Sequence, residues 1–286
     1  MSQPLVLKLG GELVETAAAR DRIAALAAAT SAERPLVIVH GGGRAIDADL
    51  ARRGITPKKA DGLRVTDAAT LEAVVAVLAG STNTDLVASL VGRGVRAVGL
   101  TGVDAGFGRA ERSSGHRAAS GTTVDLGLVG DPTAVDPALI LTLLDHRYVP
   151  VVASLGIAQN ADAAVGAASQ VLNVNADVMA CRIAEALAPC DLVIAGATAG
   201  VLDGSGATIC ALDADEIQHL IDSGTATAGM VAKLAAARTA VLSGVTTVRI
   251  VDGRTFEAAR GLEAAPGTPI SAAGAITTAA GRGRER

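Results

Sequence analysis

The feature that most constrains the fold of this 286-residue chain is a series of short apolar segments without polar alternation. Such continuous segments are typical of parallel strands that are covered on both faces. Longer stretches with helical periodicity lie between them. The alternation of strands and helices predicts an α/β fold with a mostly parallel central sheet. The expected strands are residues 5–9, 35–39, 95–100, 149–153, 192–195 and 247–251.

Helix signals occupy the intervals between these strands. In residues 66–90 the apolar side chains recur every three or four positions, which predicts one long helix. Asp136 followed by Pro137 is a typical helix cap with a first-turn proline. Further helices are expected after the capping-box pattern at residues 213–216 and over residues 233–242.

Two polar intervals interrupt this rhythm. Residues 105–130 are rich in Gly, Ser, Thr and Arg, and we interpret them as a hairpin excursion or flap. Residues 159–170 are a second polar loop. This loop suggests a division into an N-terminal half, residues 1–170, and a C-terminal half, residues 171–286.

Composition and charge exclude several classes of protein. Hydrophobic residues make up 50% of the chain, which is ample for a core and excludes broad disorder. The net charge of −4 and the 1% aromatic content argue against nucleic acid as a partner. No continuous apolar run reaches the roughly 18 residues of a membrane span, and no secretory signal precedes the first strand. We therefore expect a cytoplasmic protein without a membrane partner.

The cysteines and the common catalytic motifs add further exclusions. Cys181, Cys190 and Cys210 are odd in number and lack C-x-x-C spacing, so we expect reduced, mostly buried thiols and no metal site. The P-loop, protein-kinase and G-x-S-x-G motifs are absent. Residues 92–97 match G-x-G-x-x-A, but they lie between a helix and a strand, which is the wrong context for dinucleotide binding.

Two glycine-rich segments follow expected strands. Gly10 and Gly11 end the first strand, and residues 41–43, all glycine, end the second. We expect each of these segments to lead directly into a helix. Backbone amides at such strand exits bind anions, and glycine lets a ligand approach closely. Two neighbouring loops of this kind favour a polyanion, although tight turns alone are an alternative.

Lysine placement supports an anion site. The chain has four lysines, and Lys8 lies within the first apolar strand, where a cation is costly unless it meets an anion. Lys233 follows Ala228-Gly229-Met230 near an expected helix start, where a solvated charge is the alternative.

Two further polar groups point to a second ligand. Arg64 precedes a helix and is suited to bidentate capture of a carboxylate, unless it is a surface arginine. Asn173, Asn175 and Asp177 alternate, so on an extended segment they share one face. Simple helix capping is the alternative for these three residues.

Taken in this order, the motifs resemble those of the amino acid kinase family. The resemblance extends over nearly the whole chain, to about residue 270. The matching segments are residues 5–11 (LVLKLGG), 35–43 (PLVIVHGGG), 61–87, 97–102 (AVGLTG), 125–131 (DLGLVGD), 173–177 (NVNAD), 200–206 (GVLDGSG), 229–233 (GMVAK) and 251–254 (VDGR).

The resemblance implies an open three-layer α/β/α sandwich. Its N-terminal half would bind an acylated amino acid and carry a homodimer contact, and its C-terminal half would bind ATP with Mg²⁺. The most similar branch transfers the γ-phosphoryl group of ATP to the side-chain carboxylate of N-acetyl-L-glutamate, the second step of arginine biosynthesis. Because that carboxylate is already ionised at pH 7, the reaction needs no general base.

The resemblance also assigns roles to single residues. Lys8 and Lys233 would neutralise the moving phosphoryl group, and Asp177 would hold both lysines in place. Magnesium would sit mainly on ATP oxygens, with no metal cluster on the protein. The amides around Gly10, Gly11, Gly42 and Gly43 would bind phosphate oxygens, Gly42 and Gly43 would also contact the amino acid, Arg64 would pair with its α-carboxylate, and Asn173 would help to bind it.

Three departures from the family pattern leave alternatives open. Gly196-Ala197 stands where Ser/Thr-Asp is usual, and residues 102–105 read Gly-Val-Asp-Ala instead of a Gly-Lys-Asp-Gly type of turn. The early first strand predicts a dimer without the N-terminal helix of arginine-inhibited hexamers. One alternative is a sister kinase for another acylated or carrier-linked acidic amino acid, and another is a non-catalytic regulatory relative.

Overall fold

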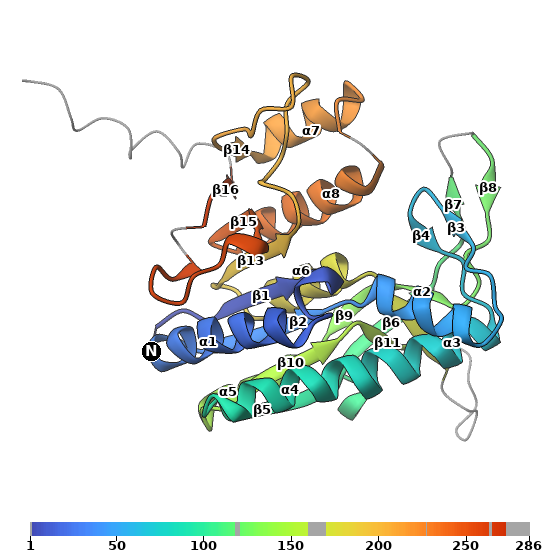
Figure 1. Cartoon of the computed structure of the whole chain (residues 1–286). Helices are drawn as coiled ribbons and strands as arrows, with labels where there is room; N and C mark the ends of the chain where they lie inside the picture. Colours follow the sequence, from blue (N-terminus) through green and yellow to red (C-terminus); the bar gives the residue numbers. More distant parts are fainter. Residues whose placement is uncertain (1, 118–120, 160–169, 227, 263–264, 273–286) are drawn as a thin grey trace, which may run out of the picture.

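A single eight-stranded sheet forms the centre of the protein (Figure 1). The computed structural model describes residues 2–117, 121–159, 170–226, 228–262 and 265–272. The strand order is β14-β16-β15-β13-β1-β2-β10-β5, and only the β15–β16 pair within it is antiparallel. The strands are β1 Leu5–Leu9, β2 Leu36–His40, β5 Ala97–Thr101, β10 Val149–Ala153, β13 Asp191–Gly196, β14 Leu212–Asp213, β15 Thr247–Asp252 and β16 Gly267–Ser271.

Helices cover both faces of this sheet. Leu5, Leu7 and Leu9 of β1 pack in one apolar cluster with residues of α1 and α4, whereas Val6 belongs to a second cluster with α5, α6 and α8. This double burial explains the continuous apolar runs, and it confirms the three-layer α/β/α fold. The helices are α1 Ala17–Glu33, α2 Gly43–Arg52, α3 Ala68–Val75, α4 Asn83–Gly92, α5 Ala138–Asp145, α6 Ala176–Ala186, α7 Ala214–Asp222 and α8 Ala228–Leu242.

The expected elements agree with the observed ones to within a few residues. The strands at 5–9 and 149–153 match, and the capping box at Asp213 and Glu216 is formed. The long helix begins after Asp67, whose side chain accepts from the Thr70 amide, and π-helical turns at Ala76–Thr82 link α3 to α4. The last predicted helix begins five residues earlier than expected, at Ala228.

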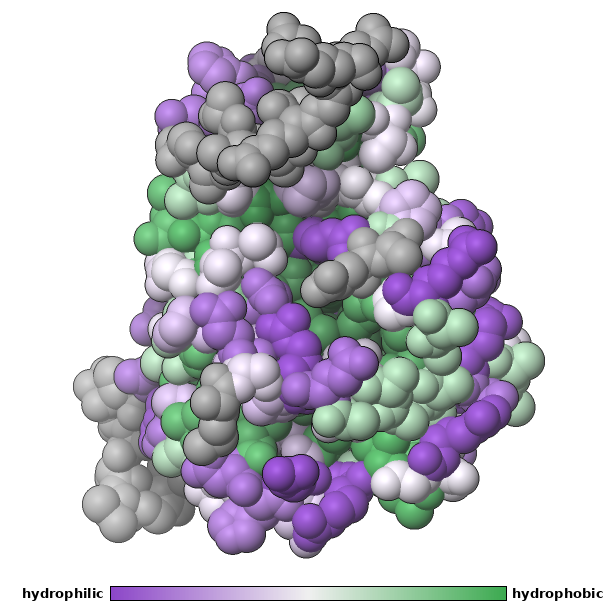
Figure 2. Space-filling model, turned by 90° about the vertical axis from the view of Figure 1, so that its left-hand side faces the viewer, coloured by the Kyte–Doolittle hydropathy of each residue, from purple (hydrophilic) through white to green (hydrophobic). Residues whose placement is uncertain are grey.

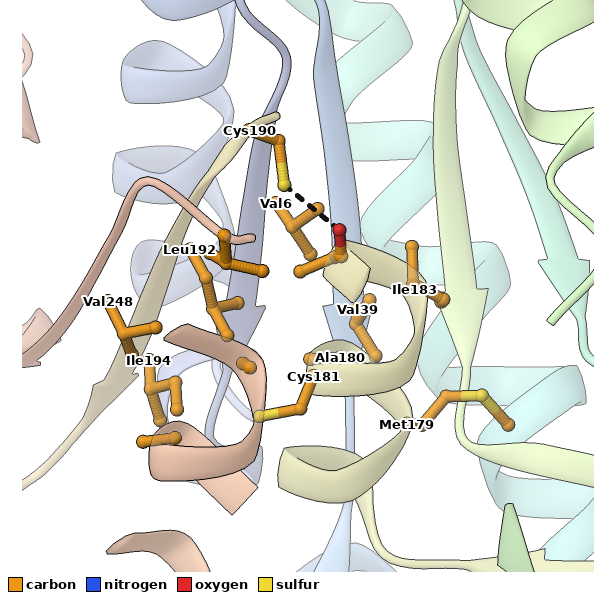
Figure 3. Packing of buried hydrophobic residues seen from close by; sticks show 14 of the residues in the cluster. Val6, Val39, Met179, Ala180, Cys181, Ile183, Cys190, Leu192, Ile194 and Val248 are labelled. Carbon is orange, nitrogen blue, oxygen red and sulfur yellow. Dashed lines mark hydrogen bonds between the residues drawn. The ribbon is translucent and has the colours of Figure 1, made fainter. Parts of the chain in front are cut away.

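The core between the sheet and α6 contains two cysteines (Figure 3). Cys190 lies 3.2 Å from the Ala184 carbonyl oxygen, to which its thiol donates. Burial raises the pKa of Cys190 to about 12 and also raises that of Cys181, so both thiols stay protonated. Cys210 is exposed, so two of the three cysteines are buried, in agreement with the expectation of mostly buried thiols.

The predicted excursion at residues 105–130 is partly a second, smaller sheet. Its four strands close in the order β11-β12-β9-β6, so β6 and β9 belong to the body of the protein and not to a flap. Only the β7–β8 hairpin projects, beside the β3–β4 hairpin (Figure 1). The strands are β3 Lys59–Ala60, β4 Leu63–Arg64, β6 Gly108–Arg112, β7 His116–Arg117, β8 Thr123–Val124, β9 Val129–Val135, β11 Leu155–Ala158 and β12 Val171–Val174.

A contact between His116 and Asp61 joins the two projecting hairpins. His116 Nε2 lies 2.8 Å from Asp61 Oδ2. Asp61 and Gly62 both have positive φ angles, 47° and 85°, as a type I′ turn requires. The β3–β4 hairpin is thereby fixed from its tip.

The sheet runs without a break through both proposed halves. β1 pairs with β2 on one side and with β13 on the other. One apolar cluster likewise holds Val39 together with Leu192 and Val248. The predicted loop at 159–170 lies almost wholly outside the described residues, and the division at residue 170 stays a prediction.

One helical run, Ala68–Gly92, is long and apolar enough to pass a length-and-hydropathy test for a membrane span. The sequence prediction rested only on continuous apolar runs and therefore did not identify this helical run as long and apolar enough for a membrane span. In the fold, α4 of this run packs on α1 and β5, and α3 packs beside α2, so the run is part of a helical layer. Hydrophilic and hydrophobic residues are interspersed on the face shown in Figure 2.

His40, the last residue of β2, is fully buried and holds the start of a glycine loop. Its Nδ1 lies 3.1 Å from the Gly41 carbonyl oxygen, and Asn83 Nδ2 donates to its Nε2 at 3.0 Å. The same Asn83 nitrogen donates to the Val151 carbonyl oxygen. Burial lowers the pKa of His40 to about 4, although the bond to Gly41 opposes that shift. The ring is therefore neutral, with its proton on Nδ1.

This burial predicts an acid-sensitive fold. The unfolded chain binds a proton on His40 near its usual pKa of 6.5, whereas the folded chain does not until about pH 4. Stability is therefore lost as the pH falls through this window, by about 2 kcal/mol between pH 7 and 5 from this group. Urea unfolding of the wild type and of His40→Gln at both pH values measures it. An equal pH dependence in the two proteins would refute the assignment.

Candidate active site

The carboxyl ends of β1, β2 and β13 meet at the middle of the sheet. Leu9 is paired with His40 on one side and with Ala195 on the other. The glycines that follow these strands therefore converge at one edge. Ligands of open α/β sheets bind at such carboxyl edges.

Two adjoining recesses lie at this edge. We call the first, of about 430 Å³, the phosphate recess, and the second, of about 200 Å³, the acceptor recess. Both share residues 41–43, Asn175 and Ala176. The phosphate recess is further lined by Lys8, Gly10, Gly11, Glu12, Asp177, Gly196, Ala197, Thr198 and Lys233, and the acceptor recess by Ile46, Lys59, Gly62, Leu63, Arg64, Leu78, Val129, Ser154, Asn173 and Val174.

Lys8 is buried in β1 and forms an ion pair with Asp177. Because side chains alternate along a strand, Lys8 points to the same face as Val6, toward α6, whose second residue is Asp177. Lys8 Nζ lies 2.7 Å from Asp177 Oδ1, and only 9% and 17% of the two side chains are exposed. Burial works against the charge of Asp177, but Lys8 and Lys233 outweigh it and lower its pKa.

Lys233 lies in the second turn of α8 and lines the same recess. Burial lowers its pKa, while the charges of Asp177 and Glu12 oppose that shift. Among the described residues Lys233 makes no ion pair of its own. Asp177 therefore contacts Lys8 directly and acts on Lys233 only through its field.

The two glycine loops differ in what they offer to an anion. The first enters a 3₁₀ turn, Gly11–Leu13, and α1 begins only at Ala17, contrary to the expectation that a helix follows directly. The Gly10 amide donates to the Ala195 carbonyl oxygen, so it is not free for a phosphate oxygen. The second loop leads straight into α2, whose first-turn amides lie at the recess.

Close packing of the loops requires glycine at two positions. A Cβ on Gly11 would lie 3.1 Å from Gly42 Cα. A Cβ on Gly42 would lie 2.9 Å from Leu78 Cδ2. The loops thus touch each other through bare backbone, which leaves the space above them to a ligand.

Arg64 lies in the wall of the acceptor recess and is not a surface arginine, since only 8% of its side chain is exposed. Its Nη2 lies 2.6 Å from Asp47 Oδ1 and donates to the Gly43 carbonyl oxygen at 3.0 Å. Its Nη1 is buried and has no hydrogen-bond partner in the part of the chain that the structure describes. Lys59 Nζ contacts the other oxygen of Asp47 at 2.7 Å. The Arg64 Nη1 group is therefore a hydrogen-bond donor that a ligand in the acceptor recess could use.

The alternating motif at residues 173–177 is divided between the two recesses. Asn173, in β12, lines the acceptor recess and donates to Thr66 Oγ1 at 3.1 Å. Asn175 caps α6 by accepting from the amides of Asp177 and Val178. Asp177 faces the phosphate recess. The capping alternative is thus correct for Asn175 alone.

Glu12, Asp47 and Lys59 are site residues that the sequence interpretation missed. Asp47 lies one helical turn after Gly43, where its spacing from the glycines was a usable signal. Glu12 directly follows the first glycine pair. Among the described residues no group of three or more His, Cys, Asp or Glu side chains is arranged to hold a metal ion.

Comparisons with known proteins found similar sequences over most of this chain. The family model described as "Amino acid kinase family" matches residues 3–252. The chain is 42% identical to the acetylglutamate kinase of Solibacter usitatus over 250 residues, which is 87% of this chain and 91% of that relative. It is 43% identical to the acetylglutamate kinase of Symbiobacterium thermophilum over 76% of this chain and 73% of that protein.

Solved structures show the same fold. N-acetylglutamate synthase from Neisseria gonorrhoeae, in complex with coenzyme A and N-acetyl-glutamate, matches with a TM-score of 0.75 and 25% identity over 94% of this chain and 59% of that chain. Carbamate kinase from Giardia matches with a TM-score of 0.65 and 15% identity over 95% and 99% of the two chains.

The ion pair predicts a specific stability pattern. Lys8→Met leaves the Asp177 carboxylate buried without its contact partner, and we expect a loss of about 3 kcal/mol in the free energy of unfolding. Lys8→Met with Asp177→Asn removes both charges and should recover most of that loss. Urea unfolding followed by circular dichroism measures both. Equal stabilities of the single and double variants would contradict this account.

Proposed function

The chain belongs to the amino acid kinase family, and we propose that it transfers the γ-phosphoryl group of ATP to the side-chain carboxylate of N-acetyl-L-glutamate. The product is N-acetyl-L-glutamyl 5-phosphate, made in the second step of arginine biosynthesis. One observation carries the proposal: the phosphate and acceptor recesses share the glycines at residues 41–43, with the Lys8–Asp177 pair below them. An acceptor and a nucleotide bound in the two recesses meet at this loop.

Electrostatics is the main demand of this reaction. The acceptor carboxylate is ionised at pH 7, so no base has to remove a proton. Its oxygen attacks the γ-phosphorus, the bond to the β-phosphate oxygen breaks, and ADP leaves with the electron pair. Two anions must approach each other, so catalysis rests on positioning and on neutralisation of charge.

Lys8 and Lys233 are the cations placed for this task. Both line the phosphate recess, from β1 on one side and from α8 on the other. The Asp177 carboxylate holds the Lys8 ammonium in place at 2.7 Å.

The acceptor recess suits a small acylated dicarboxylate. The unpartnered Arg64 Nη1 is the natural donor to the α-carboxylate, with the guanidinium oriented by Asp47 and Gly43. Asn173, also in the recess wall, offers its side-chain amide to the acylated amino group. Gly42 and Gly43 allow the distal carboxylate to reach the phosphate recess.

Magnesium is proposed to enter with the nucleotide and to neutralise phosphate charge. The phosphate recess fits this role, because its described residues include carboxylates but no closed set of metal ligands.

We further propose a cytoplasmic homodimer, in which residues 1–170 bind the amino acid and make the dimer contact, while residues 171–286 bind ATP. The helical run Ala68–Gly92 is only partly buried although it is strongly apolar. It lies beside β5, the edge strand of the sheet. Its exposed residues include Ala69, Ala76, Gly80, Thr84, Ala88 and Val91.

The activity is tested by trapping the acyl phosphate with hydroxylamine. We expect hydroxamate with Mg-ATP and N-acetyl-L-glutamate, and none with glutamate, aspartate or N-acetylaminoadipate assayed in parallel. Product from another acceptor would identify a sister kinase. Folded protein that gives no hydroxamate with any acceptor would overturn the proposal.

Variants separate the two recesses in the same assay. Lys233→Ala removes a charge that acts on the transferring group, so kcat should fall by about 10²–10³-fold. Arg64→Ala should chiefly raise KM for N-acetyl-L-glutamate, by about tenfold or more, and leave KM for ATP unchanged. A rise in KM for ATP alone would show that Arg64 does not bind the acceptor.

The dimer contact is tested at Gly80. A side chain there meets nothing within 4 Å in the protomer, so Gly80→Arg should fold but block close approach of a second copy. Sedimentation should show a dimer for the wild type and a monomer for the variant. Ala29→Arg, at an exposed position of α1, is the control and should stay dimeric. A dimeric Gly80→Arg protein would place the contact elsewhere.

A further inference from the structure

Glu12 is an acidic residue in a recess built for anions. It follows the first glycine pair, in the 3₁₀ turn after β1, and lines the phosphate recess with Lys8 and Lys233. We propose that Glu12 is the protein ligand, direct or through water, for the divalent cation that accompanies the nucleotide. This proposal rests on the proposed kinase function.

The position of the carboxylate is the first argument. The Glu12 side chain folds back over Gly10, so that its Oε2 lies 2.6 Å from the point where a Cβ on Gly10 would stand. Its Oε1 lies 3.5 Å from the corresponding point on Gly196, and Lys233 Nζ lies 3.9 Å from that same point. The carboxylate thus faces the middle of the recess across two bare glycines.

Elimination of the other carboxylates is the second argument. Of the described residues that line the phosphate recess, only Glu12 and Asp177 carry a carboxylate. Asp177 is occupied by Lys8 at 2.7 Å. Nearby, Glu15 is paired with Arg44 and Asp252 with Arg254. Glu12 has no ion pair among the described residues, although Lys233 and Arg254 lie close enough to interact with its charge, so its oxygens are the ones left to contact an added cation.

Charge gives the third argument. A phosphate chain that enters the recess meets the Glu12 carboxylate as a like charge, which opposes binding unless a cation lies between them. Mg²⁺ commonly takes one or two carboxylates together with substrate phosphates and keeps several waters. Glu12 therefore makes binding of the nucleotide depend on the divalent cation, and disfavours the metal-free nucleotide.

The test measures binding of the non-hydrolysable nucleotide AMP-PNP by calorimetry, with MgCl₂ and separately with EDTA. Wild-type protein should bind AMP-PNP much more tightly with Mg²⁺ than without it. In Glu12→Gln, which keeps the size and removes the charge, the ratio of the two affinities should fall about tenfold. The reasons are weaker binding with Mg²⁺ and tighter binding without it.

Two further variants control for fold and for general charge. Glu15→Gln neutralises a neighbouring carboxylate outside the recess and should keep the wild-type ratio. Gly10→Ala keeps the Glu12 charge but moves the carboxylate, because the new Cβ would occupy the position where the Glu12 carboxylate now lies. The φ angle of −62° at Gly10 is one that alanine adopts without strain. We expect Gly10→Ala to lower the ratio as well, which tests the proposal even if Glu12→Gln folds poorly.

Three outcomes overturn the proposal. An unchanged ratio in Glu12→Gln would show that Glu12 does not engage the cation. Equal tightening with Mg²⁺ and with EDTA would show that Glu12 only repels phosphate or balances Lys233. Failure of the folded wild type to bind AMP-PNP under either condition would overturn the proposed kinase function itself, and the cation role with it.

Discussion

The buried ion pair between Lys8 and Asp177 is the interaction around which the centre of this protein is arranged. A lysine in the central strand of a sheet is costly to bury, and the contact with the first turn of α6 offsets much of that cost. The pair fixes α6 against β1 at the carboxyl edge. The lysine that we propose to act on the phosphoryl group therefore also helps to determine how one helical layer meets the sheet.

The glycine loops depend on the same edge. His40 anchors the start of the second loop from below, while contacts between Gly11 and Gly42 bring the two loops together without side chains. The result is a surface of backbone amides between two cations, Lys8 and Lys233. Asp177 and Glu12 line the same recess, and the formal charges of these four side chains sum to zero. In our proposal the polyanion therefore enters a recess whose net charge is zero and not strongly positive.

The fold could be predicted from the sequence because parallel strands leave continuous apolar runs, and Lys8 stood out because it interrupts one of them. The glycines at 10–11 and 41–43 could also be recognised, because each group directly follows an apolar run. The partners of Arg64 and His40 were not, since Asp47 and Asn83 reach them only through the packing of α2 and α4. Glu12 was missed because an acidic residue after a turn is usually solvated, and only the fold shows that it turns back over Gly10. The projecting hairpins had too little apolar pattern to predict which strands join the body.

Gly196 links the most unusual part of the sequence to this charge arrangement. The resemblance led us to expect a hydroxyl residue here and a carboxylate at position 197, and this chain has Gly196 and Ala197 instead. In the structure, a side chain on Gly196 would enter the space between the Glu12 carboxylate and the Lys233 ammonium. Both distances from the Cβ position on Gly196, 3.5 Å to Glu12 Oε1 and 3.9 Å to Lys233 Nζ, are ordinary van der Waals contacts. Glu12 therefore supplies a carboxylate beside the end of β13, where positions 196 and 197 of this chain carry none.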